Sequence, residues 1–214
     1  MRGLVALGDS ITVGEGSMTL GVTPLSWAQW LAMALDLPFT NYARNGAVVA
    51  DVRREQLPRV RPGHDVACLY AGVNDARGPS FDPDAYEADL LAVARGLRER
   101  AGRLLLCTLP LDLGRPRAAP KPAIANCAVR RVAAQTGAVV CELDDLRGWV
   151  EVLPDAVHPT AIGQVAIADR AARALGAPVL PSALAGVPRG RRARLRYLPA
   201  RGRALLRERA HRHR

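Results

Sequence analysis

The sequence predicts an α/β protein, a three-layer α/β/α sandwich built around a five-stranded parallel sheet. Short, almost continuously apolar runs alternate with longer segments in which apolar residues recur at helical spacing. Strands that are apolar throughout are typical of parallel sheets covered by helices on both faces. Right-handed crossovers leave few topologies open, and of these we expect the flavodoxin-like strand order 2-1-3-4-5.

The first half of the chain holds three of the expected strands and two of the expected helices. Strand, helix, strand, helix and strand are expected, in this order, at residues 3–8, 27–35, 39–43, 48–57 and 66–71. Ser26 precedes the first helix and is a favoured N-cap residue, because its hydroxyl can accept a bond from a free helix amide. Pro58 predicts the end of the second helix, because proline does not continue one.

The second half continues the alternation to the end of the sheet. Helix, strand, helix, strand and helix are expected, in this order, at residues 83–100, 104–109, 123–136, 138–143 and 160–175. Asp82 and Thr160 stand where N-caps belong. Gly102, Gly137 and Gly176 stand where the three helices should stop.

The charge of the chain is unevenly distributed. Residues 189–214 hold 11 arginines and one glutamate, which is the whole net charge of +10. We therefore expect one neutral domain over residues 1–188 and an Arg-rich tail over residues 189–214, disordered or partly helical. Such a tail is attracted to an anionic membrane surface or another polyanion, here through Arg189–Arg214, whereas no motif predicts specific nucleic-acid binding.

The N-terminus and the cysteines bear on the compartment. No apolar stretch reaches the roughly 20 residues that a membrane-spanning helix needs, and no secretory signal is evident. A cytoplasmic location is expected, peripheral to a membrane if the tail docks there. Four cysteines in no metal-binding pattern are expected to be buried free thiols, with a disulfide between neighbouring strands as the alternative: Cys68, Cys107, Cys127 and Cys141.

A serine follows the first strand. Gly8-Asp9-Ser10 comes directly after the apolar run at residues 4–7. The turn places the hydroxyl at the carboxyl edge of the sheet, where open α/β sheets bind their ligands. Alone, such a turn is more often structural than catalytic, and Asp9 alone would be a turn residue that binds local amides.

Further polar residues follow other strands and are expected at the same edge. Asn74, after the third strand, has a side-chain amide that can donate to an oxyanion, and the backbone amide of Gly46, after the second, can donate as well. Asp155 precedes His158 by three residues, a spacing at which a carboxylate can orient an imidazole. Each motif alone is ordinary turn chemistry, but together and in this order they predict nucleophilic catalysis.

In these motifs the chain resembles the SGNH hydrolase superfamily, which includes the GDSL esterases and lipases. The matching blocks are Gly8-Asp9-Ser10 followed by Ile11 in place of the usual Leu, Asn41 with Gly46, Gly72-x-Asn74-Asp75, and Asp155-x-x-His158-Pro159. The resemblance covers about residues 1–176 and implies a flavodoxin-like fold. It also implies a nucleophile at Ser10, a base at His158, an orienting acid at Asp155, and an oxyanion hole made by the amides of Ser10 and Gly46 and the side chain of Asn74.

The expected function is therefore that of a serine esterase, which acts on a small-molecule ester with small or mid-size acyl groups and needs no cofactor or metal. Two alternatives stay open: an acyltransferase that uses the same triad, and a non-catalytic protein that docks on a polyanion or membrane. The loops at the expected site supply the candidate substrate contacts, which are Asp9, Met18, Asp75, Arg77 and Trp149.

Overall fold

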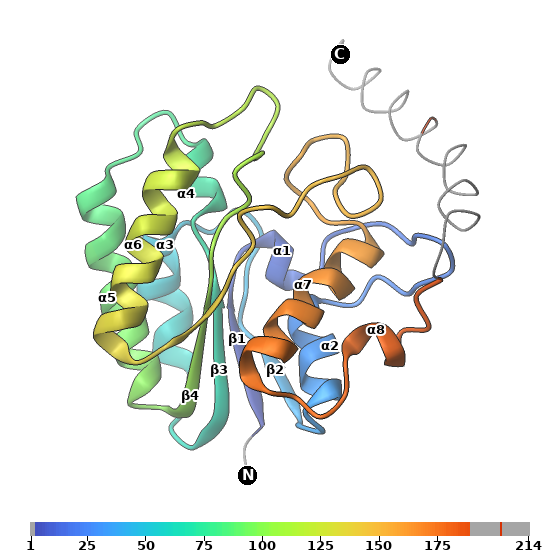
Figure 1. Ribbon diagram of the computed structural model, residues 1–214. Coiled ribbons are helices and arrows are strands. Elements are labelled where there is room, and N and C mark those ends of the chain that lie inside the picture. Colours follow the sequence, from blue (N-terminus) through green and yellow to red (C-terminus); the bar gives the residue numbers. More distant parts are fainter. Residues whose placement is uncertain (1–2, 189–201, 203–214) are drawn as a thin grey trace.

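The computed structural model describes residues 3–188 and residue 202, and its centre is one five-stranded sheet (Figure 1). The strand order is β2-β1-β3-β4-β5 and every neighbouring pair is parallel, so the predicted topology is confirmed. The strands are β1 (Leu4–Gly8), β2 (Phe39–Asn41), β3 (His64–Tyr70), β4 (Ala101–Cys107) and β5 (Val139–Cys141).

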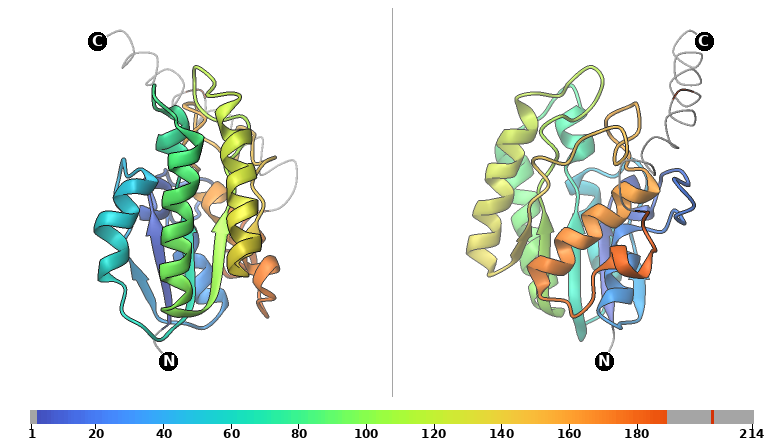
Figure 2. Two further views of the ribbon diagram at one scale, coloured as in Figure 1. Left: turned by 90° about the vertical axis from the view of Figure 1, so that its left-hand side faces the viewer. Right: turned by 45° about the vertical axis from the view of Figure 1, so that its right-hand side comes forward.

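Helices cover both faces of the sheet and give the predicted three layers (Figures 1 and 2). One face carries α2 (Trp27–Ala34), α7 (Ala161–Leu175) and the short α8 (Pro181–Leu184). The other carries α5 (Pro83–Arg98), α6 (Lys121–Thr136) and the segment that begins with α3 (Val49–Asp51). All five residues of β1 are buried between these layers, which explains why the run has no polar alternation.

The predicted caps are present at the long helices. The side chain of Ser26 accepts from Ala28 N, that of Asp82 from two amides at the start of α5, and that of Thr160 from Gly163 N. Gly137 and Gly176 adopt the left-handed conformation at the ends of α6 and α7. Thus α2, α5 and α7 begin, and α6 and α7 end, where capping chemistry predicts.

The segment expected as one helix at residues 48–57 is less regular. It starts as α3, widens into the π-helical segment η1 (Val52–Gln56) and closes with the 3-10 turn η2 (Leu57–Arg59). Three short helices were not predicted: α8, α1 (Ser10–Val13) and α4 (Val73–Arg77). Of these, α1 and α4 closely follow β1 and β3, so they lie at the edge of the sheet where the candidate site is expected.

Two predictions are corrected by the structure. Gly102 is not the stop of α5, which ends at Arg98; it lies inside β4, because pairing with β3 already begins at His64 and Ala101. All four cysteines are free as expected, but Cys127 is exposed on α6, so the prediction that all four are buried is wrong.

The basic tail lies outside the described residues apart from residue 202, and the expectations for Arg189–Arg214 stay predictions. Within the described part of the chain, every helix is too short or too polar to cross a bilayer.

Candidate active site

Ser10, His158 and Asp155 form a hydrogen-bonded chain at the carboxyl edge of the sheet. Ser10 Oγ lies 3.0 Å from His158 Nε2, and His158 Nδ1 lies 2.6 Å from Asp155 Oδ2. The other carboxylate oxygen of Asp155 accepts from the backbone amides of Val157 and His158. The local turn thus fixes the acid, and the acid in turn fixes the imidazole with Nε2 facing the serine hydroxyl. This is the geometry that activates a serine hydroxyl as a nucleophile.

In the hydrogen-bonded residues Ser10, His158 and Asp155, the charge of the carboxylate stabilises the protonated form of the imidazole. The hydrogen bond that His158 donates to Asp155, with the charges of Asp155, Glu15 and Asp9 adding to it, raises the pKa of His158 above its usual value, although burial opposes the rise. Burial of Asp155 works to raise the pKa of this carboxyl, but the bonds from His158 and the two amides outweigh it and lower the pKa. Asp155 therefore stays ionised and favours the imidazolium that forms when His158 takes a proton.

The turn after β1 aims Ser10 at the histidine. Asp9 Oδ1 accepts from Ile11 N and caps α1, of which Ser10 is the first residue. Gly8 has a φ of +150°, and a Cβ at this position would lie 2.1 Å from the carbonyl oxygen of Tyr70 on the neighbouring strand. Only glycine lets β1 and β3 approach this closely just before the serine.

The expected oxyanion donors lie on the neighbouring loops. The Asn74 side chain donates to the carbonyl oxygen of Ala47 at 3.0 Å, which ties α4 to the loop that carries Gly46. One of the two amide hydrogens of Asn74 is thereby used and the other is left for a ligand. The amides of Ser10 and Gly46 make no hydrogen bond within the described residues, and the φ of +75° at Gly46 explains the need for glycine there.

Two buried glutamines that sequence reasoning missed hold this edge together. Gln56 bonds both backbone groups of Gly8, at 2.9 Å to the N–H and 2.8 Å to the carbonyl oxygen. Gln164, on α7, accepts from Trp27 N and donates to the carbonyl oxygens of Ile11 and Glu15. A polar residue inside an otherwise apolar helix face was the available signal for both.

Sequence reasoning also missed a carboxylate next to the histidine. Glu15 Oε2 lies 3.3 Å from His158 Nε2, on the same atom that faces Ser10. Glu15 belongs to none of the motifs, because its place is set by the short helix α1, which the sequence did not predict.

The predicted substrate contacts are dispersed. Asp9 is completely buried, so the prediction that it contacts substrate is wrong; its carboxylate caps α1 instead. Asp75 accepts from Val49 N, and its burial raises the pKa of the carboxyl to about 6. Met18, in the loop after α1, and Arg77, the last residue of α4, are exposed at this edge, and for these two and Asp75 contact with substrate stays a prediction.

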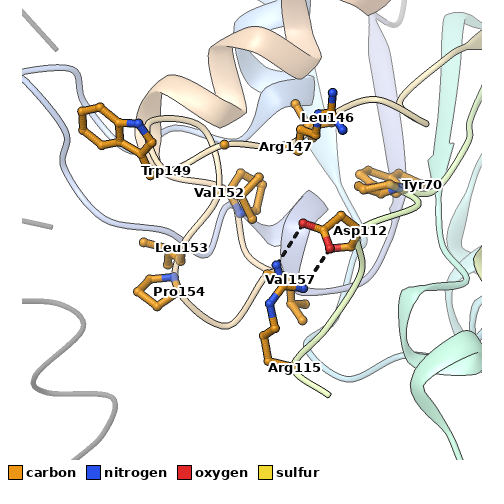
Figure 3. Close-up of a pocket in the computed structure, with 14 residues that line it drawn as sticks. Tyr70, Asp112, Arg115, Leu146, Arg147, Trp149, Val152, Leu153, Pro154 and Val157 are labelled. Carbon is orange, nitrogen blue, oxygen red and sulfur yellow. Dashed lines mark hydrogen bonds and ion pairs between the residues drawn. The ribbon is translucent and has the colours of Figure 1, made fainter. Parts of the chain in front are cut away.

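Trp149 lines a cavity of about 340 Å³ between the loops that follow β4 and β5 (Figure 3). Its walls include Val157 and Pro159, the residues on either side of His158. Figure 3 shows an ion pair on the wall between Asp112 and Arg115, with an N–O distance of 2.9 Å. The other labelled lining side chains are the polar Tyr70 and Arg147 and the apolar Leu146, Val152, Leu153 and Pro154. A cavity of this size suits a small organic group, although neither Ser10 nor His158 is among the residues that line it.

Comparisons with known proteins place this geometry in a family. Residues 6–166 match the sequence profile described as GDSL-like Lipase/Acylhydrolase family, and this range includes all three members of the hydrogen-bonded chain. No curated protein sequence matches the chain.

Solved structures share the fold at low sequence identity. LAE5, an α/β hydrolase enzyme from the metagenome of Lake Arreo, is 20% identical with a TM-score of 0.66, over 81% of this chain and 94% of its own. Axe2, an acetylxylan esterase from Geobacillus stearothermophilus, is 18% identical with a TM-score of 0.62, over 81% and 93%. A putative GDSL-like lipase from Parabacteroides merdae is 20% identical with a TM-score of 0.62, over 81% and 94%. At these identities the likeness shows the fold alone.

Proposed function

Because the chain belongs to the GDSL-like lipase/acylhydrolase family, whose members hydrolyse esters, we propose that it cleaves carboxylic esters through an acyl-enzyme on Ser10. The observation that carries this proposal is the chain of two hydrogen bonds from Ser10 through His158 to Asp155. It supplies a nucleophile, a base and an orienting acid in contact with one another.

The reaction proceeds in two halves. His158 Nε2 takes the proton of Ser10, whose Oγ bonds to the carbonyl carbon of the ester. The tetrahedral intermediate collapses as the bond to the alcohol oxygen breaks, and His158 returns its proton to the leaving alcohol. Water, losing a proton to the same Nε2, then attacks the carbonyl carbon of the acyl-enzyme. The bond from this carbon to Ser10 Oγ breaks, His158 returns the proton to Oγ, and the acid leaves. An alcohol in place of water would give acyl transfer by the same steps.

The negative oxygen of the intermediate needs donors, and we assign these to the amides of Ser10 and Gly46 and the side chain of Asn74. The two amides are unused within the described residues, and the bond from Asn74 to Ala47 O fixes the side chain beside the Gly46 loop. Each such donor lowers the barrier by roughly 3 kcal/mol. None of these steps draws on a cofactor.

The size of the cavity favours esters with small or mid-size acyl groups. The cavity that Val157 and Pro159 help to line has a volume of about 340 Å³, at the low end for ligand sites, and its walls combine apolar side chains with the charged Asp112, Arg115 and Arg147. Because the Axe2 structure is described as an acetylxylan esterase, acetylated sugars belong in the first substrate panel beside simple alkyl esters.

The test is the Ser10→Ala variant, assayed on p-nitrophenyl esters of increasing acyl length and by fluorophosphonate labelling. We expect turnover to fall at least about 10³-fold and labelling to be lost, with an unchanged melting temperature. Ser17→Ala is the matched control, because Ser17 is an exposed serine in the following loop. If the Ser10→Ala enzyme hydrolyses esters as the wild type does, the proposal is wrong.

A further inference from the structure

Glu15 is the carboxylate nearest to the atom that would transfer the proton. Its Oε2 lies 3.3 Å from His158 Nε2, while Ser10 Oγ lies 3.0 Å from the same nitrogen. The carboxylate of Glu15 and the hydroxyl of Ser10 therefore lie at the same ring nitrogen of the imidazole, Nε2, while Asp155 binds the other ring nitrogen, Nδ1.

The position of Glu15 is fixed by its surroundings. Its backbone N–H donates to the carbonyl oxygen of Ser10 at 3.0 Å, and its own carbonyl oxygen accepts from Gln164 Nε2 at 3.2 Å. Its second carboxylate oxygen, Oε1, accepts a bond from the side chain of Asn45, the residue before Gly46. The carboxylate thus spans from the histidine to the loop of the expected oxyanion donor and is not a freely rotating surface charge.

Glu15 differs from the two other carboxylates that act on His158. Asp155, Glu15 and Asp9 each raise the pKa of the imidazole. Asp9 is completely buried, and Asp155 is occupied by Nδ1 and two backbone amides. Glu15 alone of the three combines contact with Nε2 and a side chain that is 41% exposed, so its charge is open to a bound substrate.

The leaving alcohol must come to the same place. In the proposed reaction Nε2 protonates the alcohol oxygen, which therefore lies within hydrogen-bonding distance of this nitrogen. Because Glu15 Oε2 is also within 3.3 Å of the nitrogen, the carboxylate and the alcohol oxygen are within roughly 6 Å of each other. At this distance a charge on the alcohol interacts measurably with Glu15.

We propose that Glu15 is a specificity-determining residue that selects the charge of the alcohol half of the ester: it favours alcohols with an ammonium group close to the ester oxygen and disfavours alcohols with a carboxylate or phosphate there. The inference rests on the proposed esterase function and extends it to the leaving group. The acyl half, on the other side of the carbonyl, is not subject to this selection.

The test compares two esters that differ in charge and hardly in shape. A choline ester and the 3,3-dimethylbutyl ester of the same acid share their outline, with a quaternary nitrogen in one and a carbon in the other. The acyl group is the one that the wild type hydrolyses fastest as its p-nitrophenyl ester. The quantity measured is the ratio of kcat/KM for the charged and the neutral ester, at low ionic strength.

We expect the ratio to fall about fivefold in Glu15→Gln, the size of effect that a partly exposed charge produces. Glu15→Asp keeps the charge and should keep most of the preference. Glu99→Gln is the matched control, because Glu99 is an exposed glutamate between α5 and β4, at the opposite edge of the sheet, and its loss should leave the ratio unchanged. An equal ratio in the wild type and in Glu15→Gln overturns the inference.

A second measurement uses the wild type alone and therefore does not depend on whether Glu15→Gln folds. In the wild type, the ratio should decrease as salt is raised from roughly 10 mM to 500 mM, because salt screens a partly exposed charge. A ratio that does not change with salt overturns the inference. The failure of the esterase function itself would look different, since Ser10→Ala would then cleave both esters as the wild type does.

Discussion

Asp9 is a buried carboxylate beside Ser10, and the burial of its charge costs the protein stability at neutral pH. Oδ1 caps α1, whereas Oδ2 has no hydrogen-bond partner within the described residues. Burial raises the pKa of this carboxyl to about 7 from 3.8. The unfolded chain loses the proton near pH 4 and the folded protein only near pH 7, so stability contributed by the neutral acid declines as the pH rises through this window.

We therefore expect Asp9→Asn to raise the free energy of unfolding at pH 8, by about 4 kcal/mol at most, and to have little effect at pH 4. Asparagine still caps the helix but carries no charge to bury. Urea unfolding at the two pH values checks this. Asp82→Asn, at the exposed N-cap of α5, should show no such gain, and an equal effect of Asp9→Asn at both pH values would contradict the account.

The pH dependence of activity follows from His158. The imidazole must be neutral to act as a base, and its pKa is raised by Asp155. Hence kcat/KM should be full at alkaline pH and fall as the pH drops through a pKa above 6.5. In Asp155→Asn this fall should move to lower pH, and kcat should drop about 10⁴-fold, because the imidazole loses its partner and its tautomer.

Rate profiles of p-nitrophenyl ester hydrolysis between pH 4 and 9 measure both effects. Asp9→Asn is the control for this measurement. If the fall in rate at low pH is caused by protonation of His158, it should remain in this variant, which lacks the Asp9 carboxyl. An Asp155→Asn enzyme as fast as the wild type would refute the assigned role.

At the scale of elements, Gln164 joins α7 to the turn after β1. Removing its side chain in Gln164→Ala leaves the buried amide of Trp27 and the carbonyl oxygen of Ile11 without this partner. We expect a loss of about 2–4 kcal/mol in the free energy of unfolding, measured by urea titration. Gln135→Ala, on the exposed side of α6, should change stability by less than about 0.5 kcal/mol. Comparable losses in the two variants would mean that the Gln164 bonds do not matter.

The elements also show how far sequence patterns reach. Strand order, the long helices and the positions of Ser10, Asn74 and His158 were predictable, because apolar periodicity fixes the strands and a parallel sheet brings the loops after its strands together at one edge. The π-helical turn η1 was not, because its formation depends on long-range contacts such as the bonds of Gln56 to Gly8, 48 residues away. Glu15 was missed because its place depends on the short helix α1, which the sequence did not predict.

At the scale of the whole molecule, charge and chemistry are separate along the chain. The hydrogen-bonded residues Ser10, Asp155 and His158 and the expected oxyanion donors lie before residue 159, whereas the net charge of +10 comes from residues 189–214. We expect a chain ending at residue 188 to hydrolyse soluble esters like the full chain and to lose binding to anionic lipid vesicles at low salt. Sedimentation with phosphatidylserine vesicles measures the second effect, with phosphatidylcholine vesicles as the control. Equal vesicle binding of both chains would exclude the tail as the docking segment.

The hydrogen bond between Ser10 and His158 joins residues 148 positions apart in the chain. In the proposed mechanism, a nascent chain of which only the first half has been synthesised has the hydroxyl of Ser10 without the imidazole of His158, so we expect no ester cleavage until the segment that holds His158 has been added and folded. Because Ser10 and His158 are so far apart in the sequence, the protein can be divided into two fragments that each hold only one of them. Two polypeptides cut in the loop after β4 would each be silent, and ester cleavage would report their reassembly.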